Sequence, residues 1–447
     1  MNIRTTILLS VLVAPAVALL AFGPRGQVHV PPGRTVIRYW EKWTGVEAQA
    51  MQRIVDRFNE TVGAEQNIWV DYNAVSNVDQ RMLIATAGGD PPDVAGLYDH
   101  IVPQYADQGA LMELGELVAE FGIDLEAFKP IWLEIGRYEG RLYALPSTPY
   151  TIALYYNRRL FREAGLDPDR PPETIAELGE YARRLTKRAA DGRLEQMGFT
   201  PSPAMLGWWH WVWPCFFNAR LWDGQRFHLN TPAGRAAMQW IADQRAELGV
   251  EDALAFEATA GTIEGAQNPF LDGRLAMVFQ GPWVSNWMRT YAPSMDYGVA
   301  PFPSVTRKRQ NVFASTDVFV IPRGSPHPRE AMTFLKFVLR QDVMEELCSA
   351  HCKVSPFREP RPEFFATHPN PHIDVFDKMA KSADAFGYPK MPMFAQASTE
   401  MLVMLETVLR GTGAPEEAVR TTQRKIDSVV SEYQRMAAQR ATRASRP

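Results

Sequence analysis

Along the first part of the chain, short apolar runs alternate with segments whose apolar side chains recur at helical spacing. Residues 36–40, 68–72 and 93–97 are short apolar runs that predict β-strands. Between these runs, residues 46–59 and 78–86 carry apolar side chains at helical spacing, which predicts amphipathic helices. Strands that alternate with helices in this way indicate a mainly parallel sheet covered on both faces. This part of the chain therefore predicts one α/β lobe.

Helical spacing returns further along the chain. Thr174 and Glu177 are placed as a capping box after a Pro-Pro break, so a helix is expected to begin there. Residues 329–340, 400–409 and 416–433 also carry apolar side chains on one face, and the last dozen residues are expected to form a solvated basic tail. A chain of 447 residues exceeds what one core usually fills, which predicts two or more lobes.

Residues 1–33 differ in kind from the rest. Arg4 gives a short positive start, and an uncharged apolar run broken by Pro15 follows. This arrangement predicts an export signal, because the run is shorter than the ~20 residues of a membrane-spanning helix. We expect an exported protein in the periplasm or another extracytoplasmic space, with a cleaved signal peptide or, alternatively, an uncleaved N-terminal anchor.

Charge and motifs exclude several classes of function. A net charge of -4 gives no electrostatic reason to bind nucleic acid. The sequence contains no Gly-rich phosphate loop, HExxH zinc motif or serine elbow, so we expect no enzymatic activity, no cofactor and no metal. Cys348 and Cys352 are one helical turn apart with His351 between them, and we interpret them as packing thiols; a strained disulfide or a metal site is the alternative. Abundant carboxylates leave a glycoside hydrolase open as another alternative.

Four segments together carry a family resemblance. Residues 36–45 read VIRYWEKWTG, residues 92–114 read PDVAGLYDHIVPQYADQGALMEL, residues 140–186 begin GRLYALPSTPYTIALYYNRRLF, and residues 270–283 read FLDGRLAMVFQGPW. In this order, the segments resemble the extracellular solute-binding proteins of bacterial ABC importers, the group that includes maltose-binding and other sugar-binding proteins.

The resemblance implies an α/β protein with the two-lobe periplasmic-binding-protein fold (type II). Each lobe is expected to hold a mainly parallel sheet flanked by helices, and the hinge to consist of crossover segments near residues 148–153, 297–301 and 341–350. Residues 34–148 and 298–344 would form lobe 1. Residues 149–297 and 345–440 would form lobe 2.

The resemblance also implies a function. The chain is expected to be the substrate-binding component of an ABC importer, to bind a sugar or oligosaccharide in the cleft between the lobes, and to deliver it to a membrane permease. It would act as a monomer, with a carbohydrate ligand and the permease subunits as its partners. The alternatives are a secreted carbohydrate-active enzyme and a binder of another small polar solute.

A sugar site needs flat aromatic surfaces and groups that make strong hydrogen bonds. Trp283 ends a Gly-Pro-Trp turn where the family places a stacking aromatic, and Trp43 and Tyr98 follow strand ends, where open α/β sheets bind ligands. In the Trp208–Trp213 cluster, alternation favours Trp211 and Trp213 for the cleft and assigns the other Trp residues, Trp208 and Trp209, to packing. Carboxylates at strand ends and an Arg are further candidates, with helix capping or solvated loops as the alternative. The expected ligand-binding residues are Trp283, Glu41, Trp43, Tyr98, Asp99, Tyr150, Trp211, Trp213, Asp317, Arg358 and Phe394.

Overall fold

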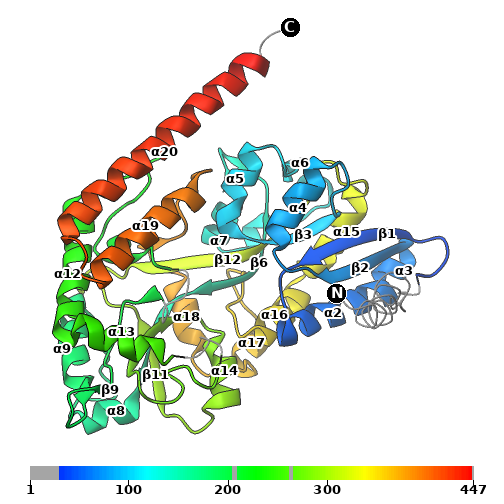
Figure 1. Cartoon of the computed structure of the whole chain (residues 1–447). Helices are drawn as coiled ribbons and strands as arrows, with labels where there is room; N and C mark the ends of the chain where they lie inside the picture. The colour runs from blue at the N-terminus through cyan, green and yellow to red at the C-terminus, as the bar shows by residue number, and fades with distance from the viewer. Residues whose placement is uncertain (1–29, 204–208, 261–264, 445–447) are drawn as a thin grey trace, which may run out of the picture.

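The computed structural model describes residues 30–203, 209–260 and 265–444. Almost all of the predicted export segment, residues 1–33, and Trp208 lie outside these ranges. The described chain forms two α/β lobes, and a pair of long strands runs between them (Figure 1).

The first sheet has six strands in the order β13-β12-β3-β1-β2, with β6 also paired to β12. β1 is parallel to β2 and β3, as the sequence predicts, whereas β12 is antiparallel to β3 and to β6. The strands are β1 (Thr35–Glu41), β2 (Ile68–Ala74), β3 (Val94–Tyr98), β6 (Leu145–Thr151), β12 (Val312–Val320) and β13 (Ala385–Phe386).

Helices cover this first sheet because each presents an apolar face to it. Helix α2 shows the pattern: Met51, Ile54 and Phe58 recur at helical spacing and are at most 1% exposed. The other elements of this lobe are α3 (Val62–Glu65), α4 (Val78–Ala87), η1 (Asp99–Ile101), α5 (Val102–Asp107), α6 (Gly115–Glu120), η2 (Leu125–Ala127), α7 (Pro130–Ile135), β4 (Arg137–Tyr138), β5 (Arg141–Leu142) and α15 (Pro328–Val338), with α2 at Gly45–Glu60.

The second sheet has three strands, β7 (Ala153–Asn157), β10 (Met277–Gln280) and β11 (Tyr297–Pro301). Both neighbours of the central strand β7 run antiparallel to it. This differs from the mainly parallel sheet expected in each lobe. β10 follows α13 (Val250–Ala258) and β11 follows the eight-residue helix α14 (Val284–Tyr291), and both strands pair with β7 in the opposite direction.

Most of the remaining helices lie around the second sheet, whereas α16 (Gln341–Ala350) packs against α2 and β6 of the first sheet's lobe. The predicted capping box begins α9, because Glu177 N donates to Thr174 Oγ1 at 3.2 Å and Thr174 N donates to Glu177 Oε2 at 3.1 Å. The remaining elements are α8 (Arg158–Glu163), α9 (Ile175–Leu185), β8 (Lys187–Arg188), β9 (Leu194–Gln196), α11 (Trp213–Phe216), α12 (Pro232–Leu248), α13 (Val250–Ala258), α14 (Val284–Tyr291), α16 (Gln341–Ala350), α17 (Pro362–Ala366), α18 (Ile373–Met379), α19 (Phe394–Leu409) and α20 (Pro415–Ala444).

The first and second sheets are joined through buried strands. The chain leaves β6 of the first sheet and enters β7 of the second at Ile152, and it returns between β11 and β12. Every residue of β6 and β12 is buried. The lobe boundaries expected from the sequence, residues 34–148 with 298–344 and residues 149–297 with 345–440, stay a prediction.

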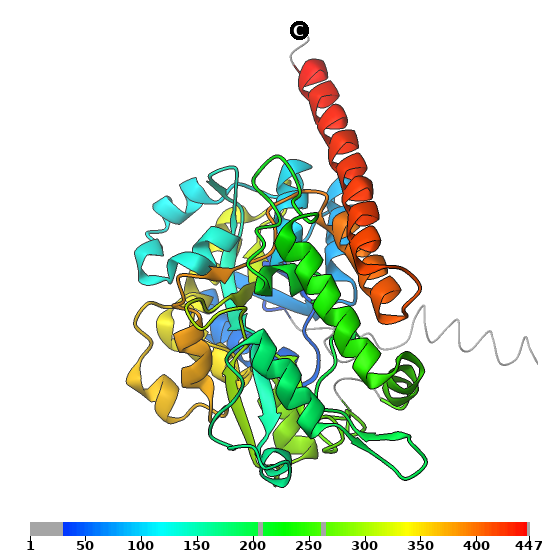
Figure 2. The same cartoon turned by 90° about the vertical axis from the view of Figure 1, so that its left-hand side faces the viewer.

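Helix α20 contains 30 residues, and its last turns extend beyond the body of the molecule in both views (Figures 1 and 2). Within the described ranges, no helix is long and apolar enough to cross a membrane. Cys215, Cys348 and Cys352 are all buried and free, so the alternative of a Cys348–Cys352 disulfide is not present. No group of three or more His, Cys, Asp or Glu side chains in the described part of the chain is arranged to hold a metal ion.

Candidate functional site

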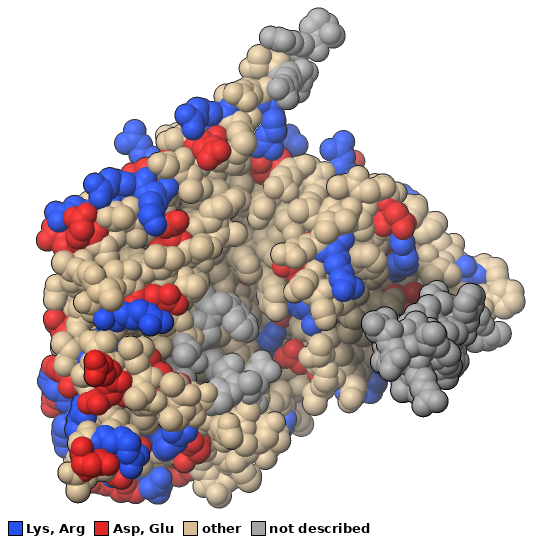
Figure 3. All heavy atoms as spheres, viewed as in Figure 1, with Lys and Arg blue, Asp and Glu red and all other residues tan. Residues whose placement is uncertain are grey.

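A cavity of about 620 Å³ lies between elements of the two lobes. One side comes from the loop after β1, the end of β3 and the middle of β12, and the other side comes from the end of β10 and from α14. On the face shown in Figure 3, charged side chains of both signs are scattered over the outer surface. A volume of this size suits a small-molecule ligand.

Trp283 is the central aromatic side chain of the cavity. Its ring lies 5.0 Å from the ring of Tyr150, edge to face, and 5.7 Å from the ring of Trp209, nearly parallel to it. A Cβ atom on Gly281 would lie 2.2 Å from the Trp283 ring. Glycine is therefore required at position 281, because any side chain there would displace the indole.

Trp43 lines the cavity from the β1 side. His351 packs edge-on against its ring, with 4.6 Å between the centroids, and the Nε2 atom of His351 is 3.2 Å from the carbonyl oxygen of Glu47. Burial lowers the pKa of His351 to about 3, so the imidazole is neutral and acts as a packing surface that holds Trp43.

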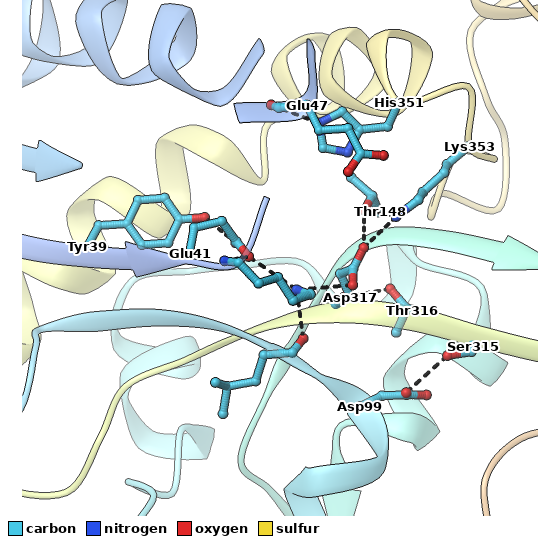
Figure 4. A network of polar contacts seen from close by, with 12 residues as sticks. Tyr39, Glu41, Glu47, Asp99, Thr148, Ser315, Thr316, Asp317, His351 and Lys353 are labelled. Carbon is cyan, nitrogen blue, oxygen red and sulfur yellow. Dashed lines mark hydrogen bonds and ion pairs between the residues drawn. The ribbon is translucent and has the colours of Figure 1, made fainter. Parts of the chain in front are cut away.

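A buried polar network borders these aromatic rings (Figure 4). Asp317 is at its centre: Oδ1 lies 3.1 Å from Lys42 Nζ, and Oδ2 accepts hydrogen bonds from Lys353 Nζ at 2.5 Å and Thr148 Oγ1 at 2.8 Å. Glu41 Oε1 lies 3.1 Å from the same Lys42 ammonium. The two lysines and two carboxylates have side chains no more than 8% exposed.

The ion pairs fix the charge of the network. Burial would raise the pKa of Asp317, but the ammonium groups of Lys353 and Lys42 outweigh burial and hold that pKa well below its usual range. Burial would lower the pKa of Lys42, and the carboxylates of Asp317 and Glu41 hold it above its usual value. Glu41 has a raised pKa, chiefly because it is buried. Asp317 is therefore ionised at neutral pH and Lys42 is protonated.

The network leaves one lysine N–H donor without an acceptor among the described residues. An ammonium group has three N–H donors. Lys42 directs its donors at Glu41, Asp317 and the carbonyl oxygen of Leu97, which lies 3.2 Å away. Lys353 has two acceptors among the described residues, Asp317 and Thr148, and it lines the cavity. Its Nζ atom lies 5.9 Å from the centre of the Trp283 ring, and its third N–H has no acceptor among the described residues.

The structure brings five of the expected ligand-binding residues together. They all line the same cavity, and they are Trp43, Tyr98, Tyr150, Trp283 and Asp317. Contact between these residues and a ligand stays a prediction.

Glu41 and Asp99 lie beneath the cavity and do not line it. Glu41 is completely buried, accepts from Tyr39 OH at 2.7 Å, and fits only because Gly96 has no Cβ, which would come within 1.7 Å of its carboxylate. Asp99 is 5% exposed, accepts from Ser315 Oγ at 3.0 Å, and has a pKa that burial raises to about 7. We therefore do not propose direct ligand contact for either carboxylate.

The other four expected residues also lie away from the cavity. Trp213 is completely buried among aromatic rings, and Phe394 is buried with its ring 5.4 Å from that of Tyr388. Trp211 lines a different groove. Arg358 is exposed, and its Nε donates to the carbonyl oxygen of Glu126 at 2.7 Å, so its guanidinium faces the surface.

Several lining residues were not expected from the sequence. Lys42 directly follows Glu41, and Lys353 lies just before the segment that contains Arg358, but neither position shows that both cations meet on Asp317. Trp209, which the sequence analysis assigned to packing, stacks on Trp283 and lines the cavity. Trp287 could have been found, because it follows Trp283 by four residues on α14 and four-residue spacing places side chains on one helix face.

Comparisons with known proteins agree with this architecture. The family model described as bacterial extracellular solute-binding protein matches residues 43–345. A protein of Brucella abortus (strain 2308), named as a binding protein, is 23% identical over 359 residues, which cover 78% of this chain and 82% of the relative. The sn-glycerol-3-phosphate-binding periplasmic protein of Escherichia coli (strain K12) is 28% identical over 204 residues, covering 43% of this chain and 42% of the relative. The solved structure of CpMnBP1 with mannotriose bound superposes with a TM-score of 0.77 at 26% identity, covering 87% of this chain and 99% of that one.

Proposed function

The chain belongs to the family of bacterial extracellular solute-binding proteins, and from this premise we propose that it captures a sugar or oligosaccharide between its lobes as the substrate-binding component of an ABC importer. Its role is to hold the ligand without changing it, so no catalytic step is assigned to any residue.

The observation that carries the proposal is the arrangement around Trp283. A half-buried indole lies in a cavity of about 620 Å³, with a second indole, Trp43, and the phenol ring of Tyr98 in the same lining. The Lys353 ammonium and the Asp317 carboxylate lie beside these rings. A pyranose has apolar C–H faces and a rim of hydroxyl groups, so it can stack on the rings and exchange hydrogen bonds with the charged pair.

The two sides of the cavity support a closure mechanism. Trp283 and Trp287 come from the β10–α14 side, whereas Trp43, Tyr98 and Asp317 come from the first sheet. A sugar that contacts both sides gains more contacts when the lobes approach, and therefore shifts the population towards closed molecules. Only contacts that differ between the open and closed forms contribute to this shift.

Delivery requires partners outside the chain. We propose that the closed form docks, as a monomer, on the membrane subunits of an ABC permease and releases the sugar there. The protein acts outside the cytoplasm, after export directed by residues 1–33, which are then cleaved or kept as an anchor. The family membership supports the export, because the family is extracellular.

A second class of ligand has a specific observation in its favour. The E. coli relative is named for binding sn-glycerol 3-phosphate, and Lys353 and Arg289 supply positive charge at this cavity. Asp317 neutralises part of that charge, because it pairs with both Lys42 and Lys353. We therefore place a phosphorylated polyol second to an uncharged sugar.

A ligand panel tests the proposal. We would measure thermal shifts and titration calorimetry on the purified protein with mannotriose, maltotriose, their monosaccharides and sn-glycerol 3-phosphate. A ligand that binds only the folded state raises the melting midpoint by mass action. We expect a sugar to raise the midpoint and to be recovered intact by chromatography. Binding of sn-glycerol 3-phosphate alone would favour the second ligand class, and recovery of shortened sugars would instead identify a carbohydrate-active enzyme.

A further inference from the structure

A second hollow, of about 1090 Å³, lies beside the main cavity. We call it the C-terminal groove, because α20 lines it with Tyr433 and Gln434. Asp107 and Tyr138, from α5 and β4, lie on the side of the first sheet, and residues 218–224 and most of residues 383–393 form a large part of the remaining lining. The groove therefore lies between the same two parts of the molecule as the main cavity.

Contacts across the groove hold its walls together. Arg440 Nη2 lies 2.8 Å from Asp107 Oδ2, and the hydroxyl group of Tyr433 donates to the other oxygen of Asp107. Lys390 pairs with Glu134 on the side of the first sheet. These contacts join α20 and the segment after β13 to α5 and α7, so the walls of the groove are tied to each other.

The lining has the chemistry that suits a sugar. Trp222 and Tyr388 are half-buried, and they leave part of their aromatic surfaces open. Asn218 and Arg220 add exposed amide and guanidinium donors. Arg220 makes no hydrogen bond and no ion pair with any residue that the structure describes, so its donors are available.

A row of rings connects the two hollows. It starts at Tyr98 in the lining of the main cavity and continues to His100, whose ring is nearly parallel to it at a centroid distance of 5.8 Å. His100 lies 5.0 Å from Tyr388, which lines the C-terminal groove, and Tyr388 lies 5.0 Å from Trp211, which lines it too. His100 is half-buried, and burial lowers the pKa of its imidazole to about 4, so it is neutral at physiological pH. The row is thus a series of packed, uncharged aromatic rings between the two hollows, and its middle ring, His100, lines neither of them.

We propose that the C-terminal groove binds the continuation of the sugar chain held in the main cavity, so that the preferred ligand is a linear oligosaccharide that occupies both hollows. The inference rests on the proposed function and adds the length of the ligand to it. Successive sugar units would stack along Tyr98 and Tyr388, and the hydroxyl groups beyond them would face Arg220 and Asn218.

Calorimetry with oligosaccharides of increasing length tests the inference. The probes are the linear manno- and gluco-oligosaccharides of two to six units, titrated into the wild-type protein, Trp222→Ala and Arg220→Gln. In the wild type, we expect Kd to fall by about tenfold or more between the disaccharide and the hexasaccharide of the preferred series, the gain of one well-placed aromatic contact. Trp222→Ala should remove most of this gain and leave Kd for the disaccharide unchanged, and Arg220→Gln should remove a smaller part of it.

Trp69→Ala is the matched control, because Trp69 is a half-buried indole on β2 that lines neither hollow. It should leave both Kd values unchanged, and the melting midpoint of each variant establishes that it is folded. If wild-type Kd is the same for all lengths, or if Trp222→Ala and Arg220→Gln both retain the full gain, the groove does not bind the sugar chain and the proposed function still stands. If no sugar of any length binds the wild type, the proposed function fails and this inference fails with it.

Discussion

Two regions of the molecule are rich in tryptophan, and they differ in how completely the indole rings are buried. Around Trp213, the rings of Trp240, Phe216 and Phe302 lie within 6.2 Å and the indole is completely buried. Around Trp283, the neighbouring rings are as close, but the indole keeps an exposed part, and Lys353 is 5.9 Å from its centre. The same type of side chain is thus enclosed in the hydrophobic core in one region and borders a hollow with charged groups in the other.

The difference indicates that the extent of burial determines whether an indole mainly stabilises the fold or can also contact a ligand. An indole that is fully surrounded contributes its whole apolar surface to folding. An indole that lines a cavity leaves surface exposed to water in the empty protein, and this surface becomes available to a ligand. We therefore expect changes near Trp213 to alter the free energy of unfolding, and changes near Trp283 to alter affinity.

The largest effect is expected for Trp213→Ala. Truncating a fully buried tryptophan should lower the free energy of unfolding by about 3 to 5 kcal/mol, because it removes apolar contacts and leaves a cavity. Chemical denaturation measures this loss. The sugar affinity of the folded fraction, measured by calorimetry, should not change. A stable variant that has lost sugar binding would place Trp213 in the binding site and remove the contrast between the two regions.

Asp317→Asn should also lower the free energy of unfolding, although Asp317 lines the cavity. The change leaves the buried ammonium groups of Lys42 and Lys353 without their shared carboxylate, and breaking a buried ion pair costs about 3 to 5 kcal/mol of unfolding free energy. Asp296→Asn is the control, because the Asp296–Arg162 pair is exposed and such pairs contribute about 0 to 1 kcal/mol. Equal losses for the two variants, measured by denaturation, would show that the network under the cavity does not stabilise the fold.

Trp283→Ala should act mainly on binding. Loss of an aromatic anchor should weaken sugar affinity by about 1 to 3 kcal/mol, because the sugar loses its stacking surface. The melting midpoint of the ligand-free protein should stay nearly constant. Gly281→Ala is a second route to the same result, since a Cβ there would lie 2.2 Å from the Trp283 ring and displace it. Unaltered affinity together with a large loss of stability would assign Trp283 to the core.

The smallest effect concerns pH and Asp99. Burial raises the pKa of Asp99 to about 7, whereas in the unfolded chain its pKa is near the usual value of about 3.9. Between these values the folded state binds more protons than the unfolded state, so the stabilisation present at low pH is lost as pH rises through about 7. From about pH 6 to about pH 7.5, the wild type should lose about 1 kcal/mol more unfolding free energy than Asp99→Asn. Denaturation curves at the two pH values measure the difference, and parallel behaviour of the two proteins would show that Asp99 ionises freely.

Much of the first lobe could be predicted from local pattern. The spacing of apolar residues gives β1, β2 and β3 and places α2 at residues 46–59, against Gly45–Glu60 in the structure. Trp43 follows β1 and Tyr98 is the last residue of β3, and both line the cavity, because the carboxyl ends of parallel strands meet at one edge of a sheet. The local pattern of residues is therefore sufficient to predict a structural feature that depends on one strand or one helix.

The features of the site that local sequence does not predict depend on strand pairing between distant segments or on turns. Lys42 and Asp317 are far apart in sequence, so their meeting follows from the antiparallel pairing of β12 with β3, which no local pattern shows. The sequence of the Trp208–Trp213 cluster predicts alternating side chains, as in a strand, but Trp213 begins the short helix α11. Alternation therefore does not apply: Trp209 lines the main cavity, Trp211 lines the C-terminal groove and Trp213 is buried in the core.

A crystal structure of the protein with the tightest-binding oligosaccharide of the panel tests the central claim most directly. We expect a sugar ring stacked on Trp283 between the lobes, with a hydroxyl group within hydrogen-bond distance of Lys353 Nζ. Sugar bound only outside the space between the lobes, or bound there without contact to Trp283, would contradict it.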